Sequence, residues 1–213
     1  MASYTPNLNL LMKDPVADGA DTFNIETMLN QNWEKIDRQV LLAMAAAAAN
    51  FYDHPSKDLA LVGITGTNGK TTTTYLVEHI ARVAGKRTGV IGTVGIRIGD
   101  EAEKSAHTTP ESPDLQQLFA RMRDARCDVV AMEVSSHALD LDRTWDAAFA
   151  VTAFSNLTQD HLDYHHTFEA YFEAKARLFS KDYPAKRVIC IDDKWGRELL
   201  RRCATNEDSI VTT

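Results

Sequence analysis

Short apolar runs alternate with amphipathic stretches along the chain from residue 59 onward. Residues 59–65 (LALVGIT) have the apolar character of a buried strand, and the pattern over 71–84 predicts a helix that Gly85 ends. Further strands are predicted over 88–94, 128–133, 148–153 and 187–191, and further helices over 112–125, capped by Ser112, over 168–179 and from about Asp193. This order favours an α/β fold, a mostly parallel sheet with crossover helices.

The first forty residues follow a different pattern. Turn-forming residues are frequent as far as Gly19, and the next stretch is apolar at helical spacing, at Phe23, Ile25, Met28, Leu29, Trp33 and Ile36. We therefore expect an extended arm and a helix over residues 1–40, and a main domain over 41–213. The alanine-rich stretch 41–49 is expected to be a helix packed on protein. The first segment is interpreted equally well as a helical appendage that caps the domain or as a stretch that resembles the N-terminus of some phage tail proteins.

Composition and charge narrow the classes of partner. The chain has 30 acidic and 23 basic side chains, a net charge of −7 and no lysine-rich or arginine-rich block, which argues against nucleic acid. No apolar run approaches the roughly 20 residues that span a bilayer, and no signal pattern begins the chain, so a membrane is not expected either. Three widely spaced cysteines, Cys127, Cys190 and Cys203, fit a reducing cytoplasm.

The strongest chemical signal is the segment 63–74 (GITGTNGKTTTT), which lies between an apolar strand and a helix. In this setting successive backbone N–H groups can surround a phosphate. Lys70 can reach the terminal phosphates of ATP, and the hydroxyl of Thr71 is placed to bind Mg²⁺. Ile64 stands where the general phosphate-loop spacing has glycine, so the loop is a variant. The predicted nucleotide-binding residues are Gly66, Thr67, Asn68, Gly69, Lys70, Thr71 and Thr72.

Other polar residues follow predicted strands, and the carboxyl ends of parallel strands form the ligand-binding edge of such sheets. Glu133 ends the strand 128–133, where its carboxylate can hold Mg²⁺. The segment DHLDYHH contains His161, and the residues alone favour a histidine that is hydrogen-bonded to Asp160 or Asp163. A zinc site is a weaker alternative, built from Asp160, His161, Asp163, His165 and His166.

The loop GTNGKTTT resembles the ATP loop of the Mur ligases, which extend the peptide of the bacterial cell-wall precursor. Four further motifs resemble the same family and follow in its order: HTTPESPDL, MEVSSHALDLDR, FSNLTQDHLDYH and EAKARLF. The resemblance covers residues 40–213 and points to the members that add the third amino acid. It implies an ATP-dependent acid–amino-acid ligase that forms an acyl phosphate on UDP-N-acetylmuramoyl-dipeptide and joins it to diaminopimelate or lysine.

The resemblance also implies roles for single residues. Lys70, His161 and Lys175 would be catalytic, and Thr71, Glu133, His161 and Lys175 would hold Mg²⁺, with Lys175 carbamylated. Hydroxyl and guanidinium groups suited to an anionic, sugar-linked substrate are assigned to the UDP-N-acetylmuramoyl-dipeptide, at Thr108, Thr109, Ser135 and Arg143.

The family has three domains, and only the central, ATP-binding one is matched. We expect that domain to be truncated at its C-terminal end, and a separate chain is a candidate source of the missing domains. We therefore predict that this chain binds Mg²⁺–ATP weakly and does not turn over alone.

Three other interpretations compete with this one. A folylpolyglutamate synthase-like ligase shares the loop type and the carbamylated lysine, although HTTPES and EVSSHALDLDR argue against it. Residues 1–40 resemble the N-terminal stretch of some phage tail proteins, which suggests a noncatalytic phage-related or structural fusion that carries a ligase remnant. A regulatory ATP-binding module is the third possibility.

Overall fold

The computed structural model describes residues 3–4, 11–12, 25–203 and 210–213. The chain divides into two compact units, Met1–Met44 and Ala45–Thr213, which are described separately. In the first unit, strand β1 (Ser3–Tyr4) pairs antiparallel with β2 (Leu11–Met12). Most of the expected turns of the arm lie outside the described residues.

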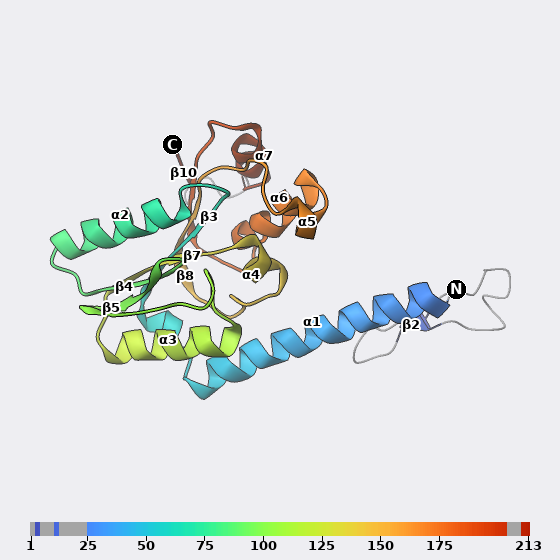
Figure 1. The fold of residues 1–213 in the computed structure, drawn as a ribbon, viewed down its shortest axis with the longest axis horizontal. Helices are drawn as coiled ribbons and strands as arrows, with labels where there is room; N and C mark the ends of the chain where they lie inside the picture. Colours follow the sequence, from blue (N-terminus) through green and yellow to red (C-terminus); the bar gives the residue numbers. More distant parts are fainter. Residues whose placement is uncertain (1–2, 5–10, 13–24, 204–209) are drawn as a thin grey trace. The chain divides into compact units, whose positions relative to one another are not determined.

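Helix α1 (Ile25–Phe51) begins in the first unit and ends in the second (Figure 1). The two helical stretches predicted over 23–36 and 41–49 are therefore one helix, and Phe23 lies outside the described residues. Continuity is physically reasonable because no glycine or proline interrupts residues 25–51. Ala45 and Ala49 are fully buried in the second unit.

The second unit contains an eight-stranded sheet in the order β10-β9-β8-β3-β7-β4-β5-β6. Six of its strands are parallel: β3 (Ala60–Thr65), β4 (Thr88–Gly92), β7 (Val129–Glu133), β8 (Phe149–Phe154), β9 (Lys186–Ile189) and β10 (Ile210–Thr212). Two strands at one edge, β5 (Gly95–Ile98) and β6 (Glu101–Glu103), are antiparallel. The predicted α/β class with a mostly parallel sheet is confirmed.

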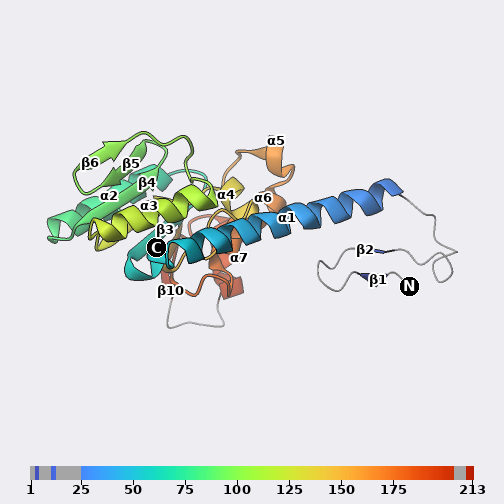
Figure 2. The same cartoon turned by 90° about the horizontal axis from the view of Figure 1, so that it is seen from below.

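Helices connect the parallel strands. They are η1 (Pro55–Asp58), α2 (Lys70–Val83), α3 (Ser112–Asp124), α4 (Ser136–Asp140), α5 (Leu162–His165), α6 (Phe168–Ala176), η2 (Arg177–Phe179) and α7 (Lys194–Cys203). Figure 1 shows α2 and α3 on opposite faces of the sheet, and Figure 2 shows the same elements from below. The chain crosses from β3 to β4 in one direction and returns to β7 in the other, so right-handed crossovers place these helices on opposite faces.

Several predicted boundaries were wrong in detail. Strand β4 ends at Gly92 rather than at residue 94, because Gly92 pairs with Gly95 across a hairpin that the sequence analysis did not predict. Ser112 is the first residue of α3, and Glu111 is its cap. The helix predicted over 168–179 changes to a 3₁₀ turn after Ala176.

Three parallel strands bring their carboxyl ends together at the centre of the sheet. Ile64 of β3 lies opposite Glu133 of β7, and Thr65 of β3 lies opposite Phe154 of β8. The loops that follow these three strands therefore leave the sheet side by side. This edge is the position at which open parallel sheets bind ligands.

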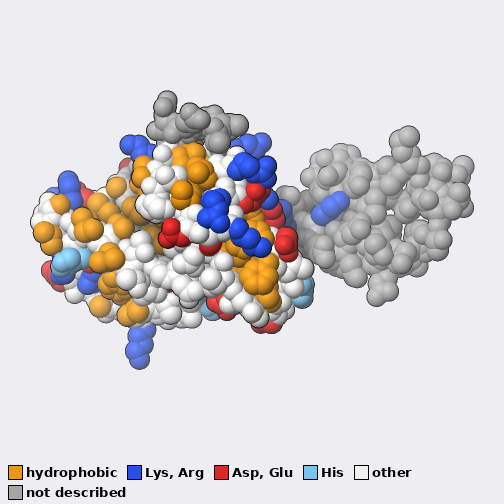
Figure 3. Space-filling model, turned by 90° about the horizontal axis from the view of Figure 1, so that it is seen from above, with side chains coloured by type: hydrophobic (Ala, Val, Ile, Leu, Met, Phe, Trp, Pro, Cys, Tyr) orange, Lys and Arg blue, Asp and Glu red, His pale blue; other side chains and the backbone are white. Residues whose placement is uncertain are grey.

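Helix α2 has an inverted distribution of polar and apolar side chains. Its sheet-facing side carries the buried carboxylate of Glu78, which accepts a hydrogen bond from Thr88 Oγ1 at 2.8 Å and forms an ion pair with Arg97. Its outer side carries large exposed hydrophobic residues, and Figure 3 shows hydrophobic side chains on this face. These residues are Leu76, Ile80 and Val83, with 56%, 66% and 75% of their surface exposed.

A phosphate loop and a buried carboxylate form the candidate active site

The candidate site begins with the loop that joins β3 to α2. Gly66 and Gly69 have φ values of 144° and 85°, which favour glycine. At Gly66 space is limiting as well, because an added Cβ would lie 2.0 Å from Ser155 Oγ. The residue types of the loop are thus required by its backbone path.

The residues after β8 hold the outer side of this loop. Thr67 N donates to Asn156 O at 2.9 Å, and Asn68 N donates to Asn156 Oδ1 at 3.0 Å. Asn156 Nδ2 donates in return to Asn68 O at 3.1 Å. The backbone N–H groups of two loop residues are therefore already used in hydrogen bonds within the protein. Anion binding then depends on the first turn of α2, whose N–H groups have no partner within a helix and carry its positive dipole end.

Two lysines converge on one carbonyl of the loop. Lys70 Nζ donates to Gly66 O at 2.9 Å and to Thr67 O at 2.9 Å, and Lys175 Nζ donates to Gly66 O at 2.8 Å. Burial lowers the pKa of Lys70, although the charges of Glu133 and Asp160 oppose that effect. Burial and the charge of Lys70 lower the pKa of Lys175 well below its usual value. The neutral amine of Lys175 is thereby favoured.

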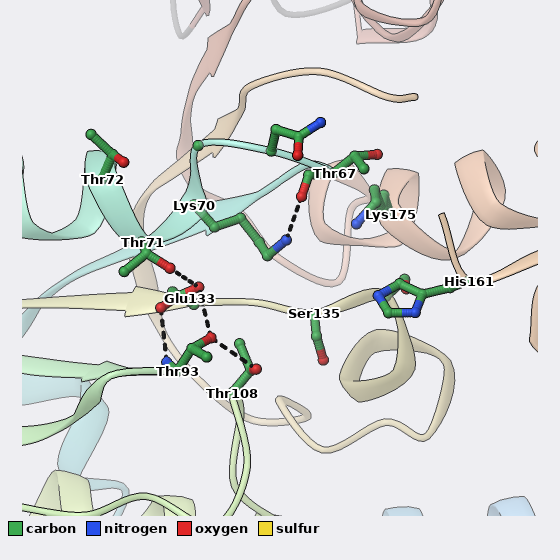
Figure 4. Close-up of a pocket in the computed structure, with 13 residues that line it drawn as sticks. Thr67, Lys70, Thr71, Thr72, Thr93, Thr108, Glu133, Ser135, His161 and Lys175 are labelled. Carbon is green, nitrogen blue, oxygen red and sulfur yellow. Dashed lines mark hydrogen bonds between the residues drawn. The ribbon is translucent and has the colours of Figure 1, made fainter. Parts of the chain in front are cut away.

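Glu133 is the centre of the hydrogen bonds on the other side of the cavity (Figure 4). Its carboxylate is buried and accepts from Thr71 Oγ1 at 2.9 Å, from Thr93 N at 2.8 Å and from Thr93 Oγ1 at 3.3 Å. Thr93 Oγ1 lies 3.0 Å from Thr108 Oγ1. Gly92 is packed against the same carboxylate, since an added Cβ would lie 2.3 Å from Glu133 Oε1.

The four residues predicted to bind substrate take two positions. Thr108 and Ser135 line the cavity, whereas Thr109 is buried behind it, where its hydroxyl donates to Glu133 O at 2.9 Å and accepts from Ser135 N at 3.0 Å. Arg143 donates to Thr109 O at 3.2 Å and pairs with Glu111 at 2.6 Å. Arg143 does not line the cavity.

His161 lies at the mouth of the cavity, in the left-handed conformation (φ 49°). Its ring is packed edge-on against His137, with centroids 4.9 Å apart, and its Nε2 lies 3.4 Å from Asp160 Oδ2. Within the described ranges no group of three or more His, Cys, Asp or Glu side chains is arranged to hold a metal ion, so the zinc alternative has no geometric support.

These side chains surround one cavity of about 350 Å³. Eleven of its lining residues were predicted as site residues: Thr67, Asn68, Gly69, Lys70, Thr71, Thr72, Thr108, Glu133, Ser135, His161 and Lys175. The lining also includes Thr93 and Ser136, which the sequence analysis missed. Thr93 was assigned to the interior of a strand predicted to run to residue 94. The flanking glycines Gly92 and Gly95 were the turn signal that could have ended the strand earlier and identified Thr93 as a strand-end residue.

The donor groups define the chemistry that the cavity can perform. Two lysines and a helix N-terminus attract a polyanion, and hydroxyl and carboxylate oxygens beside them suit a hard divalent cation. Side chains for this purpose come from three neighbouring strand ends of a parallel sheet. The fold and the site together define a phosphate-loop nucleotide-binding domain of the α/β class.

The particular family is shown by comparison. Residues 64–213 match the Mur ligase middle domain, and the chain belongs to the Mur ligase family. A curated relative from Corynebacterium glutamicum, a UDP-N-acetylmuramoyl-L-alanyl-D-glutamate–2,6-diaminopimelate ligase, is 52% identical over 163 residues. That match covers 75% of this chain and 32% of the relative. The corresponding ligase from Geobacter metallireducens is 49% identical over 174 residues, which cover 78% of this chain and 34% of the relative.

Solved structures agree with the family. A UDP-N-acetylmuramoyl-L-alanyl-D-glutamate–2,6-diaminopimelate ligase is similar with a TM-score of 0.65 at 34% identity, over 72% of this chain and 31% of that one. A folylpolyglutamate synthase from Mycobacterium tuberculosis has the same TM-score at 19% identity, over 80% of this chain and 46% of that one, a likeness of fold alone. The chain thus spans about a third of the curated relatives' length. Among the described residues no helix has the length and apolarity to cross a bilayer.

Proposed function

We propose that this chain supplies the ATP site of a ligase that adds diaminopimelate to UDP-N-acetylmuramoyl-dipeptide in peptidoglycan synthesis. The observation that carries the proposal is the juxtaposition of Lys70, Thr71 and Glu133 around one cavity at the start of α2. The substrates are taken from the names of relatives about 50% identical to this chain. The cytoplasm is the expected compartment, since ATP and UDP-linked precursors are held there.

The proposed reaction has two steps. An oxygen of the dipeptide carboxylate attacks the γ-phosphorus of ATP, and the bond from that phosphorus to the β–γ bridging oxygen breaks. ADP leaves, and the dipeptide becomes an acyl phosphate. The amine of the diamino acid then attacks the acyl carbon, and phosphate leaves as the amide forms and a proton is lost. Lys70, which now donates to two loop carbonyls, can turn to the phosphoryl oxygens and stabilise their developing charge.

The oxygen donors around Glu133 fit Mg²⁺. Thr71 Oγ1 and Glu133 Oε2 are 2.9 Å apart and face the same cavity, and hydroxyl and carboxylate oxygens are ligands that Mg²⁺ accepts. When bound, the metal would neutralise charge on the phosphates. His161, at the mouth of the cavity, is the proposed ligand of a second Mg²⁺.

Lys175 fits a metal site only after a chemical change, because an ammonium group repels cations. Its buried amine, with a pKa held well below the usual value, favours the neutral form that attacks carbon dioxide. The nitrogen–carbon bond forms, one proton is lost, and the product is an anionic carbamate. Carbon-13 NMR with labelled bicarbonate tests this: we expect a carbamate signal from the wild-type chain and none from Lys175→Arg. A signal that persists in the variant would assign the carbamate elsewhere.

The dipeptide is proposed to bind beside Thr108 and Ser135, with Arg143 and Thr109 behind them. Saturation-transfer NMR with UDP-N-acetylmuramoyl-dipeptide tests this part. We expect a signal from the wild-type chain that Ser135→Ala weakens, and an unchanged signal would place the substrate elsewhere. Little turnover by these 213 residues alone stays a prediction, which dipeptide-dependent and diaminopimelate-dependent ADP formation would contradict.

A further inference from the structure

A buried contact joins the phosphate loop to helix α6. Tyr171 Oη lies 3.2 Å from Thr67 Oγ1, and both side chains are buried. Thr67 belongs to the loop after β3, whereas Tyr171 lies 104 residues later on the helix that also carries Lys175. The contact therefore connects the loop proposed to bind phosphate with the helix that carries Lys175.

The other hydrogen bonds of Thr67 show which hydroxyl donates in this contact. Thr158 N donates to Thr67 Oγ1 at 3.0 Å, and Thr67 Oγ1 lies 3.3 Å from Thr158 O, which can only accept. A hydroxyl has one hydrogen and two lone pairs. With its hydrogen directed to Thr158 O, Thr67 has one lone pair left to accept from Tyr171. The tyrosine thus completes the hydrogen bonds of a buried loop residue.

The ring of Tyr171 lies next to Lys175 and His165. Lys175 Nζ is 4.6 Å from the centre of the ring, one helical turn along α6. The ring of His165 is also adjacent, with centroids 5.1 Å apart. One side chain therefore contacts the phosphate loop with its hydroxyl and Lys175 with its ring.

We propose that Tyr171 is a positioning residue for the phosphate loop. Its hydroxyl holds Thr67, and through Thr67 it holds the path of the loop that presents Lys70 and the first turn of α2 to phosphate. The choice of Mg²⁺–ATP as ligand rests on the proposed function, whereas the effect on the loop can be measured without nucleotide.

The chain contains a matched control for this contact. Tyr183 Oη lies 2.9 Å from Thr144 Oγ1, and both side chains are buried. Tyr183 packs against Phe149, which lies opposite Leu61 at the amino-terminal end of β3, the end remote from the loop. Tyr183→Phe therefore removes a buried tyrosine–threonine hydrogen bond of the same kind without touching the site.

The experiment compares the wild-type chain with Tyr171→Phe and Tyr183→Phe. Both variants keep their rings and are expected to lose similar stability. Only Tyr171→Phe should speed hydrogen exchange at the amides of Thr67 and Asn68, and only it should weaken Mg²⁺–ATP binding, by about three- to tenfold for one lost hydrogen bond. Equal exchange rates in the two variants would overturn the proposal.

A failure of the proposed function gives a different result. If the wild-type chain and its Lys70→Ala variant respond alike to Mg²⁺–ATP, the nucleotide assignment fails. Amide exchange in the absence of nucleotide still decides the role of Tyr171: selective loss of protection in Tyr171→Phe supports positioning, and no selective loss refutes it.

Discussion

Gly92→Ala should disable the magnesium-dependent part of nucleotide binding without altering any proposed ligand. Gly92 lies at the end of β4, beside the buried carboxylate of Glu133. An alanine Cβ there would lie 2.3 Å from Glu133 Oε1, whereas ordinary contacts begin at 3.4 Å. The carboxylate must therefore move by about 1 Å.

Such a movement breaks the bond of 2.8 Å from Thr93 N and disturbs the one of 2.9 Å from Thr71 Oγ1. A hydrogen bond to a charged group contributes about 1.5–3 kcal/mol, and overpacking in a core costs about 1–3 kcal/mol. Because the two effects overlap at one side chain, we expect the free energy of unfolding to fall by about 2–4 kcal/mol. Loss of ligand orientation should weaken Mg²⁺ binding by about 10- to 100-fold.

Denaturant unfolding and calorimetric titration of ATP, with Mg²⁺ or with a chelator, measure the two effects. Gly89→Ala, on the same strand as Gly92, is the control, since its Cβ would meet the flexible side-chain end of Met122 from α3, 2.9 Å from Sδ. That variant should lose about 1–3 kcal/mol of stability and keep its response to Mg²⁺. An unchanged magnesium dependence in folded Gly92→Ala would show that the position of the Glu133 carboxylate does not control Mg²⁺ binding.

Three further changes have distinct expected results. The pKa of Lys175 is lowered in the folded state, so the unfolded state binds more protons, and the free energy of unfolding should rise with pH from the folded-state pKa toward 10.5. Measured by urea unfolding, this rise should be smaller in Lys175→Met. An equal rise in that variant would contradict the lowered pKa of Lys175. Asn156→Ala removes two bonds to Asn68 and should weaken Mg²⁺–ATP binding in calorimetry by about three- to tenfold; unaltered affinity would refute this. Arg97→Met removes the ion-pair partner from β5 of the Glu78 carboxylate, which is 2% exposed and keeps the hydrogen bond from Thr88 and the more distant Arg82 at 3.6 Å. We expect the free energy of unfolding to fall by about 3 kcal/mol, and a loss below about 1 kcal/mol would contradict this.

Much of the fold could be predicted because the apolar strands are fully or largely buried. Residues 59–65 and 128–133 are short apolar runs without helical spacing, so a strand is the favoured prediction for both. The helix that follows the first of them ends at a glycine, Gly85, which is an ordinary helix stop signal. The antiparallel strand β6, EAE, was missed because it is entirely exposed and has no apolar face. Strand β5, GIRI, is largely buried but only four residues long, and it follows directly on a strand that was predicted to run to residue 94. The exposed Leu76 and Ile80 of α2 show the opposite problem, since periodicity alone would place them in the core.

The residues of the candidate site could likewise be predicted only in part from the sequence. Lys70 and Thr71 could be predicted because they begin the helix after the glycine loop that follows β3, and Glu133 because it ends β7 at the ligand edge. Tyr171 and Asn156 act through contacts 104 and 88 residues apart in sequence, and no local pattern reports such distances. Lys175 has no local signal either, and only the family resemblance identified it.

The central claim is that the loop from Gly66 to Thr72 binds the phosphates of Mg²⁺–ATP through Lys70. Calorimetric titration of the 213-residue chain at millimolar ATP tests it most directly. We expect a weak, saturable heat that requires Mg²⁺ and that Lys70→Ala removes. No heat from the wild-type chain, or the same heat from the Lys70→Ala chain, would contradict it.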